Sequence, residues 1–427
     1  MKNKVLNLFK GKFVRNVIVV ASGTAGAQAI TMAFLPIITR LYGPEAIGYM
    51  GLFLSVIAIF SPIVALTYPI AIVLPKEDHD AKALVKLSVI LSIGISFLLL
   101  VLFSLWGDWF STLLGMQQIQ KYLYLLPVAV LCLGFSQIAQ QWIIRVKLFK
   151  LSAAVTIKHA LLINVSKTLA GLVYPTTVIL IVLSTISNAL LALLLVFKIR
   201  KNNDKKICKV PVKTSDVIVI AKKHADFPLY RAPQVFINAI SQSFPVIVLA
   251  SFFGPVVAGY FTLARSALMA PVGLIAQSVA NVFYPRITEA ARNKEKVTNL
   301  LVKATGTLLL VSLVPFAVII IFGQEVFELV FGGEWSGAGQ YAQWISVWLF
   351  AVFISRPCIS AIPTLSMQKE FLVFEIVSFA LRTIAIYIGA VMYADALASV
   401  VYYSLTSFIL YIALIVKVIF KTKYIND

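Results

Sequence analysis

The sequence predicts an all-α polytopic membrane protein of about 12 transmembrane helices, arranged as two parallel six-helix lobes around a central cavity. Three observations lead to this fold class. The 427-residue chain is 60% hydrophobic and only 13% charged, whereas a water-soluble domain carries about 25% charged residues. Its apolar runs reach the length of about 20 residues that crosses a bilayer as a helix. Half the chain apart, it carries two copies of one short motif, Gly-Pro-x-x-x-Gly-Tyr.

The apolar runs are continuous, which excludes the alternating pattern of a transmembrane β-barrel. Short polar or basic segments separate them. The predicted spans, in chain order, are residues 16–39, 46–74, 84–106, 122–144, 152–174, 176–197, 228–252, 255–283, 298–322, 340–366, 371–393 and 396–419.

Lys and Arg are distributed unevenly over the loops between these spans. Most of the 37 lie in the N-terminal segment, in every second loop and in the C-terminal segment, whereas the opposite loops hold only Arg40 and Lys121. By the positive-inside rule the basic set is cytoplasmic, so both termini are expected in the cytoplasm. Topology thereby explains most of the net charge of +20, and no nucleic-acid partner is expected.

The repeated motif predicts the domain organisation. Because six spans are an even number, both halves enter the membrane from the same side, as in transporters built from parallel repeats. The predicted parts are an N-terminal lobe (1–200), a basic cytoplasmic linker (201–226) and a C-terminal lobe (227–427).

The motif itself, Gly43-Pro44-x-x-x-Gly48-Tyr49 and again Gly254-Pro255-x-x-x-Gly259-Tyr260, is turn chemistry. Gly-Pro is expected to end one helix and start the next in a tight periplasmic hairpin, because proline is tolerated in a first helical turn. The second glycine of each copy is expected to allow close helix approach.

Basic side chains are also expected inside the spans, where a charge costs at least about 2.5 kcal/mol and usually faces a wet cavity. The candidates for a cationic, substrate-binding cavity are Arg265, Arg356, Arg382, Lys167, Lys158 and Arg231. The last two lie nearer the cytoplasmic span ends, from which their side chains could instead reach the headgroups. Glu375 is the only acid inside a span, so an anionic substrate such as a phosphate, pyrophosphate or acidic sugar is expected to neutralise the cations.

Uncharged polar groups in the spans suit either sugar recognition or hydrogen bonding between helices. The cavity candidates among them are Asn238, Gln242, Gln277, Asn281 and His159. Glu375 and His159 are candidates for coupling transport to a cation. The sequence contains no catalytic motif, phosphate loop or metal-ligand spacing, so no catalytic residue, metal or cofactor is expected. Trp106, Trp109, Trp142 and Trp335 fall near span ends, where aromatic belts are expected.

Two stretches resemble the Wzx-type O-antigen and polysaccharide flippases. The first is TRLYGPEAIGYMGLFLSV followed by AIVLPKEDHDA, and the second is FPLYRAPQVFINAISQSFPVIVLASFFGPVVAGYFTLARSALMAPVGLIAQSVANVFYPRITEA. The likeness covers nearly the whole chain and is weakest in spans three to six and nine to twelve. Arg265 lies in the segment of closest likeness, which makes it the first candidate for the cavity.

The resemblance implies the fold of the multidrug/oligosaccharidyl-lipid/polysaccharide exporters and a transporter rather than an enzyme. The implied substrate is an undecaprenyl-pyrophosphate-linked oligosaccharide, moved by alternating access from the cytoplasmic to the periplasmic leaflet of a bacterial inner membrane. Membrane lipids, a polysaccharide polymerase and chain-length machinery are the implied partners, and no cofactor is implied.

Two alternatives stay open. A cation-coupled multidrug exporter of the same superfamily would need a buried carboxylate, and the first span has no Asp or Glu. A membrane-embedded polysaccharide polymerase or glycosyltransferase would need catalytic groups in a large periplasmic loop. The longest outer loops are short, at about 107–121 and 323–339.

Overall fold

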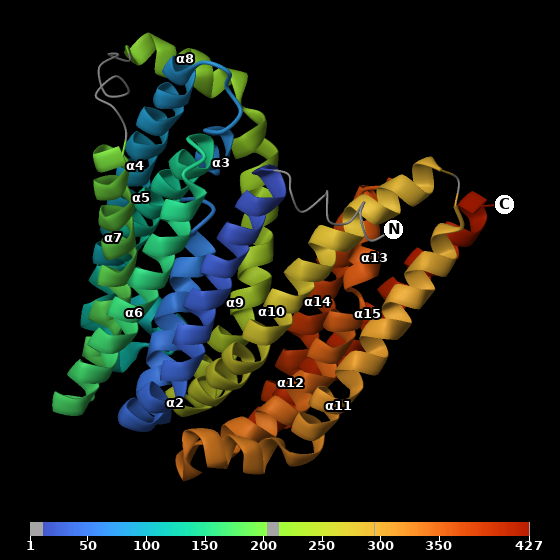
Figure 1. Ribbon diagram of the computed structural model, residues 1–427. Helices are drawn as coiled ribbons and strands as arrows, with labels where there is room; N and C mark the ends of the chain where they lie inside the picture. Colours follow the sequence, from blue (N-terminus) through green and yellow to red (C-terminus); the bar gives the residue numbers. More distant parts are fainter. Residues whose placement is uncertain (1–11, 203–212, 294, 427) are drawn as a thin grey trace. The chain divides into compact units, whose positions relative to one another are not determined.

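The computed structural model describes residues 12–202, 213–293 and 295–426, which are helical over most of their length and contain no strand (Figure 1). The long helices are α2 (Lys12–Phe60), α4 (Asp78–Leu113), α5 (Leu125–Arg145), α6 (Phe149–Val173), α7 (Thr177–Asn202), α9 (Ala232–Phe253), α10 (Pro255–Arg292), α11 (Val297–Phe331), α12 (Ser336–Ile354), α14 (Gln368–Met392) and α15 (Ala396–Asn426). The short ones are α3 (Tyr68–Ala71), η1 (Gln117–Tyr124), α8 (Thr214–Lys223), η2 (Phe227–Arg231), η3 (Gly333–Trp335) and α13 (Arg356–Ala361).

Ten helical stretches within the described residues are long and apolar enough to cross a membrane. The difference from the twelve predicted spans has two causes. α2 is two helices joined at Gly43, whose φ of 71° and ψ of 175° are not helical, so this one stretch holds most of the first predicted span and residues 46–60 of the second. The second span was predicted to reach residue 74, but its helix ends at Phe60 and residues 61–67 form turns. α6 is 25 residues long, but Lys158, His159 and Lys167 lower its mean hydropathy. The predicted class, an all-α multi-pass membrane protein, is confirmed.

The distribution of apolar side chains fits a lipid environment. On α11, Leu310 and Val314 are 70% and 68% exposed, and on α4 Phe97 is 66% exposed. Such continuous apolar faces would be a liability in water. α12 is the opposite case, because Trp348 and Leu349 are fully enclosed by other helices. α11 and α4 therefore present lipid-facing surfaces, and α12 belongs to a protein interior.

The chain divides into two compact units. The first contains the residues up to 42 together with 49–243, and the second contains 43–48 together with the residues from 244 onward. The division falls within α9. In the first unit α5 packs on α4 and α7, and in the second α12 packs on α10, α11 and α15.

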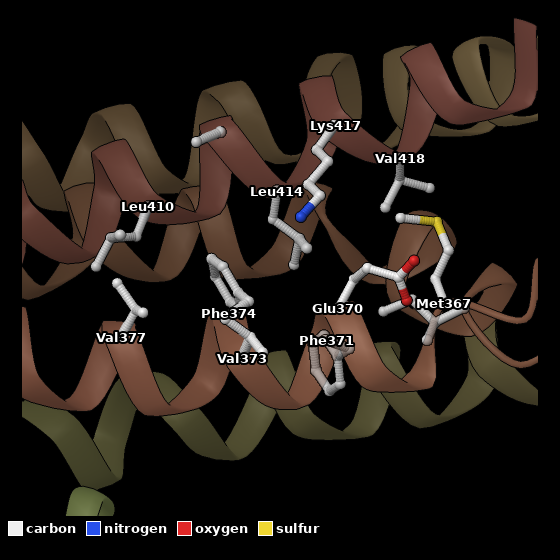
Figure 2. Close-up of a pocket in the computed structure, with 12 residues that line it drawn as sticks. Met367, Glu370, Phe371, Val373, Phe374, Val377, Leu410, Leu414, Lys417 and Val418 are labelled. Atoms are coloured by element: carbon white, nitrogen blue, oxygen red, sulfur yellow. The ribbon is translucent and has the colours of Figure 1, made fainter. Parts of the chain in front are cut away.

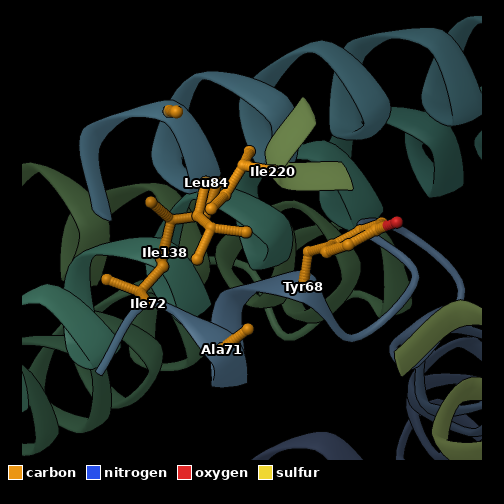
Figure 3. Packing of buried hydrophobic residues seen from close by; sticks show 7 residues of the cluster. Tyr68, Ala71, Ile72, Leu84, Ile138 and Ile220 are labelled. Atoms are coloured by element: carbon orange, nitrogen blue, oxygen red, sulfur yellow. The ribbon is translucent and has the colours of Figure 1, made fainter. Parts of the chain in front are cut away.

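The described end of the predicted linker 201–226 is a fixed part of the first unit. α8 packs on α4, and Ile220 is buried in a cluster with Tyr68, Ile72 and Leu84 (Figure 3). The Tyr68 hydroxyl donates to the carbonyl oxygen of Ala221 at 3.0 Å. Residues 203–212 of the predicted linker lie outside the described part of the chain.

A single arginine organises the turn between α3 and α4. The guanidinium of Arg145, at the end of α5, donates to the carbonyl oxygens of Ile72 and Pro75 at 3.1 and 2.7 Å. It also forms an ion pair with the Asp78 carboxylate at 2.8 Å. These bonds satisfy carbonyl groups that the helices leave unpaired.

The two copies of the repeated motif pack against each other within the second unit. Gly43 and Gly254 both have positive φ, 71° and 87°, a conformation that glycine adopts readily. A Cβ atom on Gly48 would overlap the carbonyl oxygen of Pro255. Reciprocally, a Cβ atom on Gly259 would overlap the carbonyl oxygen of Pro44. The predicted helix break and close helix approach are confirmed, and each copy supplies the surface that the other approaches.

The aromatic-belt prediction is wrong for one tryptophan. Trp106 and Trp109 are 53% and 58% exposed, as a belt requires, but Trp335 is only 1% exposed. Its ring packs edge-on against Tyr260, with the ring centroids 6.1 Å apart. Trp335 is therefore a core residue of the second unit.

Candidate functional site

The second unit buries an arginine without a full set of hydrogen-bond acceptors. Arg382, on α14, is only 4% exposed, and its Nε and Nη2 atoms have no hydrogen-bond partner within the described part of the chain. The guanidinium carbon lies 5.2 Å from the centroid of the Tyr411 ring, which is a cation–π contact. Glu375 is half-buried two turns away on the same face of the helix, and Arg382 acts on it electrostatically. An aromatic face compensates a buried charge only in part, so Arg382 retains free donor capacity.

Tyr403 links this arginine to a second one. Its side chain, on α15, is buried, and both Arg265 from α10 and Arg382 act electrostatically on its hydroxyl group. Its ring meets the Trp348 ring edge to face, at 5.3 Å between centroids. Two of the predicted cavity cations therefore interact electrostatically with the same tyrosine. The set of Arg265, Arg382, Tyr403, Tyr411 and Trp348 is called the arginine–tyrosine cluster below.

Arg356, the third arginine predicted near mid-span, lies on another helix. It is the first residue of α13 and is half-buried, and its Nε atom is buried without a hydrogen-bond partner among the described residues. Its carbonyl oxygen accepts a hydrogen bond from the Ser360 hydroxyl at 2.9 Å. Arg356 thus has donor capacity of its own but does not share Tyr403.

The first unit holds the three remaining cations, and they differ in depth. Lys167 is half-buried, and its Nζ atom lies 4.0 Å from Met50 Sδ, a weak acceptor. Lys158 is exposed on α6. Arg231 is exposed in η2 and donates to Gln234 at 3.1 Å. The exposed pair are those placed near the span ends by the sequence.

The polar candidates are not gathered at one place. His159 Nε2 lies 2.9 Å from the Ser187 carbonyl oxygen and 3.1 Å from the Ser187 hydroxyl, so this histidine is satisfied inside the first unit. Gln242 is half-buried and has an interaction partner, and Asn238 is exposed. Gln277 and Asn281 lie on α10, and their side chains are outside the described part of the structure.

The aromatic members of the cluster were not predicted from the sequence. Tyr403 and Tyr411 are eight residues apart and so share a face of α15, which is a readable signal in hindsight. Nothing in α15 itself indicates which helix supplies the arginine. Trp348 was likewise missed, and its Nε1 atom is buried without a hydrogen-bond partner in the described residues.

The cluster contains groups that are chemically able to bind an anion. A guanidinium presents a planar fork of N–H donors that matches phosphate and carboxylate oxygens, often in pairs of hydrogen bonds. Arg382 acts electrostatically on the half-buried Glu375, but the two form no ion pair within the described residues. The described residues contain no group of three or more His, Cys, Asp or Glu that could hold a metal ion.

Comparison with known proteins gives a family and a fold. The family model for polysaccharide biosynthesis proteins matches residues 37–340. A solved lipid II flippase, MurJ in an inward closed conformation, is similar with a TM-score of 0.74 and 14% identity over 94% of this chain and 87% of that one. An inward-facing multidrug resistance transporter of the MATE family is similar with a TM-score of 0.64 and 13% identity over 95% and 94%.

A third similar structure is a transporter of the MOP superfamily from Pyrococcus furiosus, with a TM-score of 0.63 and 13% identity over 98% of each chain. At these identities the likeness shows the fold alone. No curated protein matches the chain.

Proposed function

We propose, from the premise that this chain belongs to the family of polysaccharide biosynthesis proteins, that it is a membrane flippase. Its cargo would be an undecaprenyl-pyrophosphate-linked oligosaccharide, an O-antigen or other surface polysaccharide repeat unit. The direction would be from the cytoplasmic to the periplasmic leaflet of a bacterial inner membrane. The observation that carries the proposal is the buried guanidinium of Arg382, whose Nε and Nη2 atoms have no hydrogen-bond partner among the described residues.

The fold supports the same function. MurJ, one of the similar structures, is a lipid II flippase, and the family name describes polysaccharide biosynthesis. Moving a charged headgroup across a bilayer requires a polar path through the hydrocarbon region. A buried guanidinium that forms no ion pair with any described carboxylate would attract an anionic headgroup along such a path.

The binding step follows from charge and donor geometry. In the proposal, the pyrophosphate accepts hydrogen bonds from Nε and Nη2 of Arg382, while Arg265 adds a second positive charge from α10. The Tyr411 ring holds the Arg382 guanidinium in place. The site would bind the headgroup transiently during an alternating-access cycle in which lobes 1–200 and 227–427 move against each other. No bond is made or broken, so the protein is a transporter and not an enzyme.

Lys167, Arg356, Lys158 and Arg231 would act as secondary cations in this account. The half-buried pair, Lys167 and Arg356, would contribute to holding acidic sugars or phosphate. The exposed pair would attract the anionic headgroup before it enters.

A cation-coupled multidrug exporter is the second candidate, because MATE transporters share the fold. Such a protein would need a carboxylate that binds Na⁺ or H⁺ within the membrane. Glu375 is the one carboxylate in a predicted span, and Arg382 on the same helix acts on it electrostatically. The cationic surroundings favour an anionic cargo over a cationic drug.

The test is complementation of a strain that cannot display its surface glycan. Arg382→Ala, Arg265→Ala and Arg356→Ala are each expected to lower surface polymer at unchanged protein level. The loss should be about tenfold or more for Arg382, because a hydrogen bond to a charged group contributes about 1.5–3 kcal/mol. Lys303→Ala, an exposed lysine on α11, is the matched control and should leave display unchanged. Normal display from all three arginine variants would contradict the assignment.

A further inference from the structure

We propose that a pocket between α14 and α15 binds a zwitterionic phospholipid whose headgroup carries a primary amine, that is, a phosphatidylethanolamine. The pocket lies in the second unit and includes no member of the arginine–tyrosine cluster. The inference therefore stands independently of the proposed transport function.

The pocket is an apolar groove with one charge of each sign. Its volume is about 180 Å³, and its apolar walls include Phe371, Phe374, Leu410 and Leu414. Glu370 from the first turn of α14 and Lys417 from α15 are the charged lining residues. Figure 2 shows both side chains extending from the two helices toward the same space.

The two charges do not neutralise each other. Within the described residues Glu370 and Lys417 form no ion pair, although they line one pocket. A ligand that carries a positive and a negative group can satisfy both at once. In phosphatidylethanolamine the phosphate would accept hydrogen bonds from Lys417, and the ammonium would donate to the Glu370 carboxylate.

The remaining walls suit an acyl chain. Val373 and Val377 lie one turn apart on α14, line the pocket and are 59% and 46% exposed. Ala413 on α15 is also exposed, so the groove opens outward along an apolar track. The charged residues lie near the start of α14 and toward the end of α15, which the charge distribution of the loops assigns to the cytoplasmic side. A lipid in the cytoplasmic leaflet would place its headgroup at the depth of Glu370 and Lys417 and its acyl chain at the depth of the apolar track.

Each charge has a simpler role when taken alone. A glutamate in a first helical turn stabilises the helix N-terminus, and a lysine near a span end reaches the headgroup region. Neither role predicts a choice between headgroups. An anionic lipid such as phosphatidylglycerol would be attracted by Lys417 but repelled by Glu370.

The experiment is native mass spectrometry of the full-length protein in detergent, titrated with dioleoyl phosphatidylethanolamine and dioleoyl phosphatidylglycerol. The wild type is expected to bind the ethanolamine lipid more tightly, by about three- to fivefold, the range of a partly exposed charge pair. Glu370→Gln should remove this preference, and Lys417→Gln should weaken the binding of both lipids. Lys421→Gln and Glu328→Gln are matched controls outside the pocket and should change neither affinity.

Binding of phosphatidylglycerol to Glu370→Gln serves as the internal check that the variant is folded. An unchanged preference for the ethanolamine lipid in Glu370→Gln would overturn the proposal. Two further ligands distinguish a bound phospholipid from other molecules that carry a phosphate. Soluble phosphoethanolamine should not compete, because it lacks the chain. A polyprenyl phosphate that bound with the same sensitivity to Glu370→Gln would contradict the assignment of the headgroup.

Discussion

Arg382 is the only charged side chain in the described residues that is fully buried, and its environment explains how the chain tolerates it. The Tyr411 ring faces the guanidinium, and Tyr403 is close enough to interact with its charge. These contacts stabilise the cation, which forms no ion pair with an acid in the described part of the chain. An acid in the same position would compete with an anionic cargo, and the ring does not.

The aromatic face rather than the hydroxyl of Tyr411 should matter to Arg382. Tyr411→Phe keeps the face, so thermal stability and glycan display are expected to stay near those of the wild type. Tyr411→Leu removes the face and should lower the free energy of unfolding by about 1–2 kcal/mol. Thermal unfolding of both variants in the same detergent measures the difference. If both variants lost the same free energy of unfolding, the hydroxyl group of Tyr411 and not its ring would be what stabilises Arg382.

At the scale of the helix, the repeated motif is a contact between two helix starts. Gly48→Ala and Gly259→Ala are each expected to destabilise the protein by about 1–3 kcal/mol, because the new Cβ would overlap a backbone oxygen that cannot move freely. Gly273→Ala is the matched control on α10, where a Cβ meets nothing within 4 Å. It should be neutral or slightly stabilising, since alanine favours the helix by about 1 kcal/mol. Melting temperatures compare the three, and equal effects would refute the packing argument.

The turn between α10 and α11 has a pH-dependent bond. Arg286 donates to Glu295 at 3.2 and 2.5 Å through its two terminal nitrogens. This hydrogen bond lowers the pKa of the Glu295 carboxyl below its usual value of 4.5. A lowered folded-state pKa gives stability that is present above 4.5 and is lost as the pH falls through the folded pKa.

The difference in melting temperature between the wild type and Glu295→Gln should therefore be small but constant at neutral pH. It should shrink as the pH falls below 4.5. Because both side chains are exposed, the effect is a local one. A melting-temperature difference that grew as the pH fell would contradict a lowered pKa of Glu295 in the folded state.

At the scale of the whole molecule, the distribution of lysine and arginine predicts which loops face the cytoplasm. Single cysteines in a chain whose native cysteines are replaced by serine can test it in intact cells. Lys296→Cys is expected to resist a membrane-impermeant maleimide, and Gln118→Cys is expected to react. Both positions are exposed, so labelling reports sidedness rather than burial. Reaction at Lys296→Cys in intact cells would invert the topology.

Composition and turn chemistry were sufficient for much of the fold. The helical class followed from apolar runs, and the break at Gly43 followed from Gly-Pro. Sequence patterns could not foresee that the two motif copies meet, because periodicity is local and this contact joins residues half the chain apart. Trp335 was misassigned for the same reason, since its partner Tyr260 is distant in sequence.

The candidate site was predictable in its charges but not in its partners. Depth along a span identified Arg265 and Arg382, because charge in an apolar run stands out. Their convergence on Tyr403 depends on how α10, α14 and α15 pack, which no single helix encodes.

The central claim is that this protein moves a lipid-linked oligosaccharide by means of its buried arginines. To test it directly, the protein is reconstituted in liposomes that contain a fluorescent undecaprenyl-pyrophosphate oligosaccharide. The fraction of this oligosaccharide that an external glycosidase can cleave is then measured over time. The account predicts accessibility that rises with the wild-type protein and falls about tenfold or more with Arg382→Ala. A wild-type rate no faster than that of protein-free liposomes, or an unchanged rate in Arg382→Ala, would contradict it.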